Sequence, residues 1–162
     1  MKKIVIRKIK LQDSRFVLNL FNKAVENKLF KTKKKISYKQ HQKWFLGICK
    51  SPKTKILVCM LNRRKIGYIK YDLFKKSCSK VSINLDEKFR GINLGGKMLR
   101  RSYKIYCRKF KINSIYAEVL MNNKHSKFFF LKNGYRLIKM NKKLNNEFNK
   151  KNLIFLKKIN LN

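Results

Sequence analysis

Nine residues near the middle of the chain combine glycines with basic side chains in a way that suits an anionic ligand. They read Phe89-Arg90-Gly91-Ile92-Asn93-Leu94-Gly95-Gly96-Lys97 and lie between a predicted strand and a predicted amphipathic helix. Glycines let the backbone approach a ligand closely, and the free N–H groups at a helix start carry a partial positive charge. The segment therefore predicts a phosphate or pyrophosphate site, although a glycine-rich turn without a ligand explains the same residues.

This glycine-rich segment has neither of two common nucleotide-binding fingerprints, GxxxxGK(S/T) and GxGxxG. It resembles the Q/R-x-x-G-x-G/A pyrophosphate loop of GNAT acetyltransferases. Asn93 stands where that family has glycine, and we expect the loop to keep its shape because Asn tolerates left-handed backbone angles. By this resemblance the residues that hold the acyl donor are Leu85, Arg90, Gly91, Ile92, Asn93, Leu94, Gly95, Gly96 and Lys97.

A second segment, residues 118–135, resembles the same family. Its letters EVLMNNKHSKFFFLKNGY are similar to the pattern E-V…N-x-x-A…Y-x-x-x-G-F. In that family a strand and a helix separate here, and the pantetheine arm of coenzyme A passes between them. The resemblance implies acetyl-CoA as acyl donor and adds Asn123, Ser126, Phe129 and Phe130 to the donor-binding residues. It covers essentially the whole chain, so we expect one GNAT domain over residues 1–162.

The reaction of this family needs a base, because the acceptor amine must lose a proton before it attacks a thioester. The chain has only seven acidic residues, and most fall at predicted turns or caps. Glu118 instead lies inside the apolar strand Ile115–Leu120, at a position that some family members use for the general base. We expect burial to make this carboxylate a stronger base. A structural carboxylate paired with a lysine is an equal alternative.

The family's general acid is a tyrosine, and Phe130 occupies its position in this chain. A phenyl ring cannot donate a proton to the leaving thiolate. Three alternatives stay open: the thiolate leaves unaided, another group such as Tyr135 or a water molecule protonates it, or the protein is a slow catalyst. Glu118 and Tyr135 are accordingly the candidate catalytic residues.

The N-terminal half contains residues that suggest the acceptor. Phe21-Asn22, Ile36-Ser37 and His41–Phe45 are similar to an R-N…I-S…H-x-x-W-F pattern. It occurs in GNAT enzymes that acetylate nucleotide-linked amino sugars in pseudaminic-acid-type glycan pathways, and Phe21 replaces its arginine. Asn22, His41 and Trp44 are thus candidates for binding the acceptor, with helix-packing roles for His41 and Trp44 equally open. The alternatives are acetylation of a protein or metabolite amine and a non-catalytic basic nucleic-acid-binding module.

The chain is strongly basic, with 44 Lys and Arg against seven Asp and Glu and a formal net charge of +37. Such a charge attracts nucleic acids and other anionic partners. Only nine of the basic residues are arginine, whose fork suits phosphate recognition, and the lysines are spread beside abundant Asn and Ile. A biased base composition explains that pattern. We therefore expect a small-molecule acceptor, while a nucleic-acid partner is disfavoured but stays open, as does a homodimer.

Hydrophobic periodicity predicts a single mixed α/β domain. Its order, β-α-α-β-β-β-α-β-α-β-β, places helices on both faces of one sheet. We expect a GNAT fold with a mixed, mostly antiparallel sheet of about seven strands and about four helices. The helices begin near Asp13, Ser37, Leu94 and Lys124, and the strands are Lys3–Lys10, Lys55–Leu61, Lys65–Phe74, Lys80–Leu85, Ser114–Met121, one after Gly134, and Leu153–Ile159.

Several classes of protein are disfavoured. No apolar stretch is long enough to span a membrane. The first residues do not form a signal peptide, so we expect a cytoplasmic protein. The four cysteines lie far apart and, with the two histidines, offer no metal-ligand spacing. We therefore expect free thiols and no metal.

Overall fold

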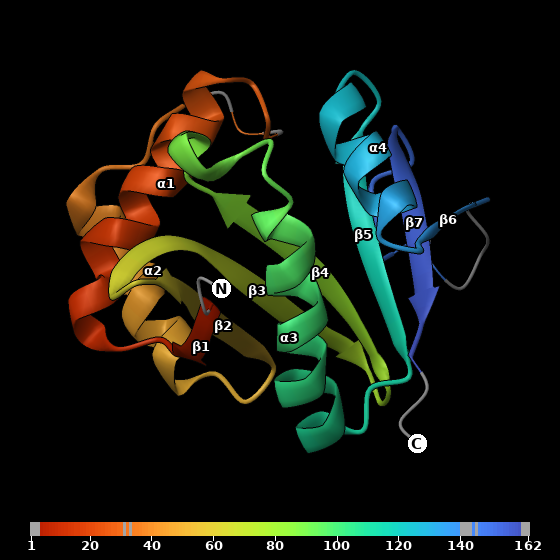
Figure 1. Cartoon of the computed structure of the whole chain (residues 1–162), viewed down its shortest axis with the longest axis horizontal. Helices are drawn as coiled ribbons and strands as arrows, with labels where there is room; N and C mark the ends of the chain where they lie inside the picture. Colours follow the sequence, from red (N-terminus) through yellow and green to blue (C-terminus); the bar gives the residue numbers. More distant parts are fainter. Residues whose placement is uncertain (1–3, 31, 33, 140–143, 145, 160–162) are drawn as a thin grey trace.

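The chain folds around a seven-stranded sheet with the strand order β1-β2-β3-β4-β5-β7-β6 (Figure 1). The computed structural model describes residues 4–30, 32, 34–139, 144 and 146–159. Neighbouring strands are antiparallel except β4 and β5, which are parallel. The predicted mixed, mostly antiparallel sheet is therefore confirmed. The strands are β1 (Ile4–Lys8), β2 (Thr54–Leu61), β3 (Arg64–Lys75), β4 (Cys78–Leu85), β5 (Ser114–Leu120), β6 (Arg136–Ile138) and β7 (Asn152–Lys158).

Within the described residues, four α-helices cover the two faces of the sheet. Ile56 of β2 packs in a cluster with residues of α1 and α2, whereas the next residue, Leu57, packs in a cluster with residues of α3 and α4. Successive side chains of a strand point to opposite faces, so the two helix pairs lie on opposite sides. The helices are α1 (Ser14–Glu26), α2 (Tyr38–Lys50), α3 (Leu94–Phe110) and α4 (Lys124–Lys132), with short 3-10 helices η1 (Leu11–Asp13) and η2 (Glu87–Phe89).

Two local signals in the sequence act as predicted. The Ser37 hydroxyl accepts a hydrogen bond from the Gln40 N–H at 3.3 Å, and the Gln40 Oε1 accepts one from the Ser37 N–H at 3.2 Å. This reciprocal capping box starts α2. Asn62 and Arg63 both have positive φ, the backbone that a two-residue hairpin between β2 and β3 requires. The sequence also predicts a lysine-rich turn at residues 31–35 and a polar loop at residues 141–151, and both lie partly outside the described residues.

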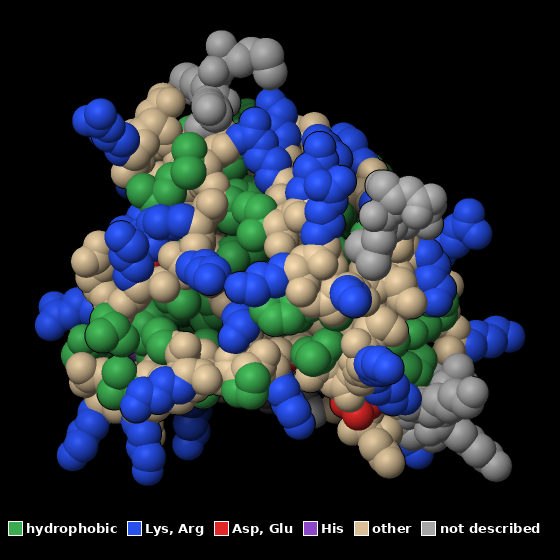
Figure 2. Space-filling model, turned by 90° about the horizontal axis from the view of Figure 1, so that it is seen from below, with side chains coloured by type: hydrophobic (Ala, Val, Ile, Leu, Met, Phe, Trp, Pro, Cys, Tyr) green, Lys and Arg blue, Asp and Glu red, His purple; other side chains and the backbone are tan. Residues whose placement is uncertain are grey.

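Positive charge is spread over the surface. In Figure 2, Lys and Arg side chains project from all parts of the face seen from below, and Asp and Glu appear only at one small spot. The described residues form five ion pairs, which engage four of the seven carboxylates. Most of the cations therefore have no carboxylate partner, and the surface field favours anionic ligands.

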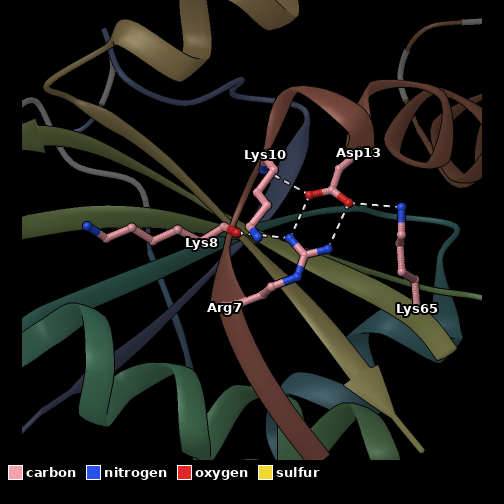
Figure 3. Close-up of polar contacts among 5 residues, drawn as sticks. All are labelled: Arg7, Lys8, Lys10, Asp13 and Lys65. Atoms are coloured by element: carbon pink, nitrogen blue, oxygen red, sulfur yellow. Dashed lines mark hydrogen bonds and ion pairs between the residues drawn. The ribbon is translucent and has the colours of Figure 1, made fainter. Parts of the chain in front are cut away.

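One buried carboxylate ties the N-terminal strand to the rest of the sheet (Figure 3). Asp13 is fully buried and accepts hydrogen bonds from both guanidinium nitrogens of Arg7, at 2.7 and 2.9 Å, and from the Lys10 N–H at 2.8 Å. The Lys65 ammonium of β3 lies 2.9 Å from the same carboxylate. Asp13 occupies the predicted N-cap position of α1, but its side chain does not cap that helix. It joins β1, β3 and the start of α1 instead.

Candidate functional site

The parallel strands β4 and β5 pair only at their first residues and then diverge (Figure 1). The pairing joins Cys78–Lys80 to Ser114–Tyr116 and stops there, while β5 continues to pair with β7 up to Leu120. Residues Val81–Leu85 of β4 therefore have no strand partner on the β5 side within the described chain. Backbone polar groups on such an edge need another hydrogen-bond partner, which an extended ligand can supply.

The predicted anion-binding loop lies directly after the diverging end of β4. Gly91 and Asn93 both have left-handed backbones, with φ of +80° and +58°. The Arg90 Nε donates a hydrogen bond to the Leu85 carbonyl at 3.1 Å, which folds the loop back onto the strand. Residues 91–93 are exposed, and α3 begins at Leu94, so its first N–H groups are without helical partners. The backbone expected at Asn93 is present, and the loop suits a pyrophosphate.

Two glycines bring the start of α3 against α4. A Cβ on Gly95 would lie 2.9 Å from the Phe129 ring, and a Cβ on Gly96 would lie 2.7 Å from the Asn133 side-chain oxygen. A real Cβ does not approach other atoms so closely, so a larger residue at either position would displace the Phe129 or the Asn133 side chain. The donor-loop residues and Phe129 are therefore neighbours in space, as the sequence predicted for one site.

The start of α4 places the other predicted donor residues beside the end of β5. Asn123 caps α4 by accepting a hydrogen bond from the Ser126 N–H at 3.0 Å, which leaves its amide NH₂ available. Ser126 is half-buried. Phe130 is buried among Phe129, Tyr135 and Phe155, so its ring is part of the core.

The candidate acid Tyr135 is buried, and its hydroxyl lies 2.7 Å from the Tyr103 hydroxyl. Burial and the nearby Tyr103 raise the pKa of Tyr135 well above its ordinary value. A hydroxyl that holds its proton this strongly and already has a partner is a poor proton donor to an outside thiolate. The geometry favours a structural role for Tyr135.

The candidate base Glu118 is exposed, so the expectation of a buried carboxylate was wrong. Its neighbours Ala117 and Val119 pack in the cluster that contains residues of α3 and α4, so Glu118 points to the opposite face of β5. Its Oε1 accepts hydrogen bonds from the Asn149 N–H at 2.9 Å and from the Asn152 side-chain amide at 2.7 Å. No cation forms an ion pair with Glu118 among the described residues. The carboxylate is therefore held in place without being neutralised.

The three candidate acceptor residues are not brought together with Glu118. The Asn22 side chain makes two hydrogen bonds with the Ile36 backbone, both at 3.0 Å. Its Nδ2 donates to the Ile36 carbonyl, and its Oδ1 accepts from the Ile36 N–H. The buried His41 Nε2 lies 2.9 Å from the Ser14 carbonyl, and burial lowers the pKa of this imidazole. Trp44 is 43% exposed and lies on α2, which packs on α1 and β2 and not on the diverging strands. The Asn22 and His41 side chains are thus engaged by backbone groups, whereas the Trp44 ring is partly exposed.

Several supporting residues were missed by the sequence reasoning. Asn84 is buried in β4, where its amide donates to the Leu20 carbonyl at 3.0 Å and thereby fixes α1 to the strand beside the divergence. A polar residue within an otherwise apolar strand was the available signal. Asn149 and Asn152, which hold Glu118, gave no comparable signal because they lie in an Asn- and Lys-rich segment.

Other kinds of site are not supported by the described part of the chain. It contains no cluster of potential metal ligands, and Cys49, Cys59, Cys78 and Cys107 are free thiols. No described helix is both long and apolar enough to cross a bilayer. A shallow basic depression at the β3–β4 turn, lined in part by Lys53, lies at the closed end of the β4–β5 pair, away from the donor loop.

Comparison with known proteins agrees with this geometry. The family model described as an acetyltransferase (GNAT) domain matches residues 6–152. No curated protein sequence matches the chain.

Solved structures share the fold at low sequence identity. The chain is similar to a ribosomal-protein-alanine N-acetyltransferase from Brucella melitensis (20% identity, TM-score 0.77, covering 96% of this chain and 99% of that one). It is also similar to a ribosomal L7/L12 alpha-N-protein acetyltransferase in complex with coenzyme A (14% identity, TM-score 0.81, covering 100% of this chain and 97% of that one). A third similar structure is yncA, a putative acetyltransferase from Salmonella typhimurium with its cofactor acetyl-CoA (16% identity, TM-score 0.74, covering 99% of this chain and 95% of that one).

These findings set aside the alternative of a non-catalytic nucleic-acid-binding module. A glycine-rich loop at the start of α3, next to a β4–β5 pair that opens, is the part of the fold suited to a coenzyme A thioester. The chain belongs to the GNAT family and is an acetyl-CoA-dependent N-acetyltransferase.

Proposed function

We propose that this enzyme acetylates a primary amine on an anionic small molecule, and that a nucleotide-linked amino sugar is the preferred acceptor. The observation that carries the proposal is the setting of Glu118. The two asparagines that hold its carboxylate flank Lys150 and Lys151, which are exposed and form no ion pair among the described residues. A base next to two unpaired cations suits an amine that is carried on a phosphorylated molecule.

In this proposal acetyl-CoA supplies the activated acyl group. The backbone N–H groups of the loop Gly91–Asn93 and of the first turn of α3 bind its pyrophosphate, and Arg90 and Lys97 add positive charge. Asn123 and Ser126 contact its pantetheine arm at the start of α4. All of these groups border the diverging strands, which positions the thioester near the end of β5.

Glu118 takes the proton from the acceptor amine, directly or through a water molecule. The hydrogen bonds from Asn149 and Asn152 orient the carboxylate, and no described cation pairs with it, so it stays accessible to the acceptor. Phe130 supplies no proton, and Tyr135 is engaged by Tyr103. We therefore infer that the thiolate leaves unaided or takes a proton from water.

A protein α-amine is a second candidate acceptor. The observation that favours it is the likeness to two structures whose names describe acetyltransferases of ribosomal proteins. At 20% identity and below, such a likeness concerns the fold, so we rank this acceptor second.

The test compares acceptors by the release of free coenzyme A thiol. A nucleotide-linked amino sugar should give a kcat/KM at least tenfold above that of the same free amino sugar at low salt. The ratio of the two kcat/KM values should fall at high ionic strength. Salt screens interactions between exposed charges over a Debye length of about 8 Å at physiological ionic strength, and that length becomes shorter as salt is added. Equal rates for the free sugar, or a preference for peptides with free N-termini, would refute the small-molecule acceptor.

A variant pair links that preference to the site. Changing Lys150 and Lys151 together to Gln should raise KM for the nucleotide-linked sugar and leave its kcat nearly unchanged. The kcat/KM for the free amino sugar should also stay nearly unchanged. The control changes Lys104 and Lys109, two exposed lysines of α3, to Gln and removes the same charge elsewhere. An equal effect of both pairs would mean that only the overall charge matters.

A further inference from the structure

Three segments converge beside the first turns of α3. The Gly96 Cβ position lies 3.3 Å from the Arg100 Nη1 and 2.7 Å from the Asn133 side-chain oxygen. The Lys157 ammonium of β7 donates a 2.6 Å hydrogen bond to the Asn133 carbonyl and lies 3.0 Å from the Gly134 Cβ position. Arg100 of α3 and Lys157 of β7 thus both lie near the end of α4.

These two cations have no carboxylate partner within the described chain. Lys157 is half-buried, and its ammonium lies over the rings of Tyr103 and Tyr135, 5.6 and 5.9 Å from their centroids. Burial, and then the charge of Arg100, lower the pKa of Lys157. Two like charges held near each other without a counter-ion destabilise the fold slightly unless an anion binds between them.

The pair lies in line with the loop that we assign to the pyrophosphate. Arg100 is four residues beyond Gly96, which is about 6 Å along the same side of the helix. The ribose of coenzyme A is attached directly to its pyrophosphate and bears a phosphate monoester at the 3′ position. A ligand whose pyrophosphate binds at Gly91–Gly96 therefore brings a second phosphate within reach of Arg100 and Lys157.

We propose that Arg100 and Lys157 form a phosphate-monoester subsite that holds the 3′-phosphate of the coenzyme A donor and selects it over donors that lack this group. The proposal rests on the donor site described above, but it does not depend on the identity of the acceptor. Arg100 provides a guanidinium fork, and Lys157 keeps two N–H groups beyond its bond to the Asn133 carbonyl. The Asn133 side-chain nitrogen donates to the Phe129 carbonyl at 2.8 Å, which fixes this residue at the end of α4.

The test measures the dissociation constants of coenzyme A and 3′-dephospho-coenzyme A by calorimetry, with no acceptor present. The wild-type protein should bind coenzyme A about tenfold more tightly. In Arg100→Met and Lys157→Met the ratio should fall toward one through a loss of coenzyme A affinity alone. Matched controls are Lys104→Met, one turn further along α3, and Lys158→Met, the next residue of β7; both should keep the wild-type ratio. A wild-type ratio near one, or a loss of both affinities together in the variants, would overturn the subsite.

Lys157→Met also removes a contact to the end of α4, so a second measurement uses the wild-type protein only. Adenosine 3′,5′-bisphosphate should displace coenzyme A at a concentration at least tenfold below that needed for adenosine 5′-monophosphate. Inorganic phosphate at the same concentration should displace far less, because it lacks the adenosine anchor. Equal displacement by the two nucleotides would contradict the proposal, and displacement by inorganic phosphate as strong as that by the bisphosphate would reassign the pair as a free-phosphate site.

Discussion

The Asn152 side-chain amide donates a 2.7 Å hydrogen bond to the Glu118 Oε1, across the antiparallel pair of β7 and β5. The bond fixes one oxygen of the carboxylate and leaves the other without a described partner. The position of the candidate base is therefore set by a residue 34 positions away in the chain.

Glu118→Gln tests this carboxylate. We expect kcat to fall about 100-fold, the usual contribution of a general base, with the affinity for acetyl-CoA unchanged. Stopped assays of thiol release and calorimetric binding measure the two quantities. Glu147→Gln, a change of another carboxylate in the segment before β7, should leave kcat within a few fold. Wild-type turnover by Glu118→Gln would eliminate Glu118 as the base.

Gly95→Ala tests the close packing of α3 and α4. The added Cβ would meet the Phe129 ring at 2.9 Å, so either the ring shifts or the two helices separate at the donor loop. We expect a loss of about 1–3 kcal/mol in the free energy of unfolding and a weaker affinity for coenzyme A. Urea titration and calorimetry check both.

Gly47→Ala is the matched control, because its Cβ would have no neighbour within 4 Å on exposed α2. It should stabilise the protein by about 0.5–1 kcal/mol through helix propensity and leave donor affinity unchanged. If Gly95→Ala instead behaves like Gly47→Ala, the helices do not meet as described.

Asp13→Asn tests the buried link between β1, β3 and α1. We expect the free energy of unfolding to fall by about 3–5 kcal/mol, because Arg7 and Lys65 are left without their counter-charge. Glu87→Gln, in an exposed pair with Lys23, should cost less than about 1 kcal/mol. Urea unfolding of both variants at neutral pH makes the comparison. Equal losses in the free energy of unfolding would show that Asp13 contributes no more to stability than an exposed ion pair does.

The same carboxylate gives a pH dependence with a definite sign. Burial alone raises the pKa of Asp13, but hydrogen bonds from Arg7, Lys65 and the Lys10 N–H outweigh it and hold that pKa well below its ordinary value. The stabilisation is fully present above the unfolded pKa of about 4 and is lost as the pH falls toward the folded pKa. The wild-type protein should lose stability below about pH 4 more steeply than Asp13→Asn.

His41→Ala separates a structural role from an acceptor role. Because His41 is buried against the Ser14 carbonyl, we expect lower stability and an unchanged acceptor KM. Burial lowers the pKa of His41, so its neutral form is favoured in the fold; the stability it contributes is present above about pH 6.5 and decreases as the pH falls below that value. Trp44→Ala should instead raise the KM for the acceptor and change the stability of the protein little. A raised KM in His41→Ala at wild-type stability would restore the acceptor role.

The sequence by itself determined the elements and the donor loop. Alternating or helical apolar spacing, the Ser37 capping box and the Asn62–Arg63 turn are local signals, and each element formed where its signal lies. The loop Arg90–Gly96 was recognisable because left-handed backbone angles and missing Cβ atoms restrict the residue types allowed. Asn93 adopts the backbone expected of it for this reason.

Only the tertiary structure decided which polar side chains are free to act. The His41 and Asn22 side chains bond to backbone groups distant in the sequence, and the Tyr135 hydroxyl bonds to Tyr103. Glu118 is exposed on the face of β5 opposite the one that packs against α3 and α4. A residue's type shows which bonds it can make, but its partners come from segments that only the packed sheet brings near. The pairing of Arg100 with Lys157, 57 positions apart, was for the same reason invisible in the sequence.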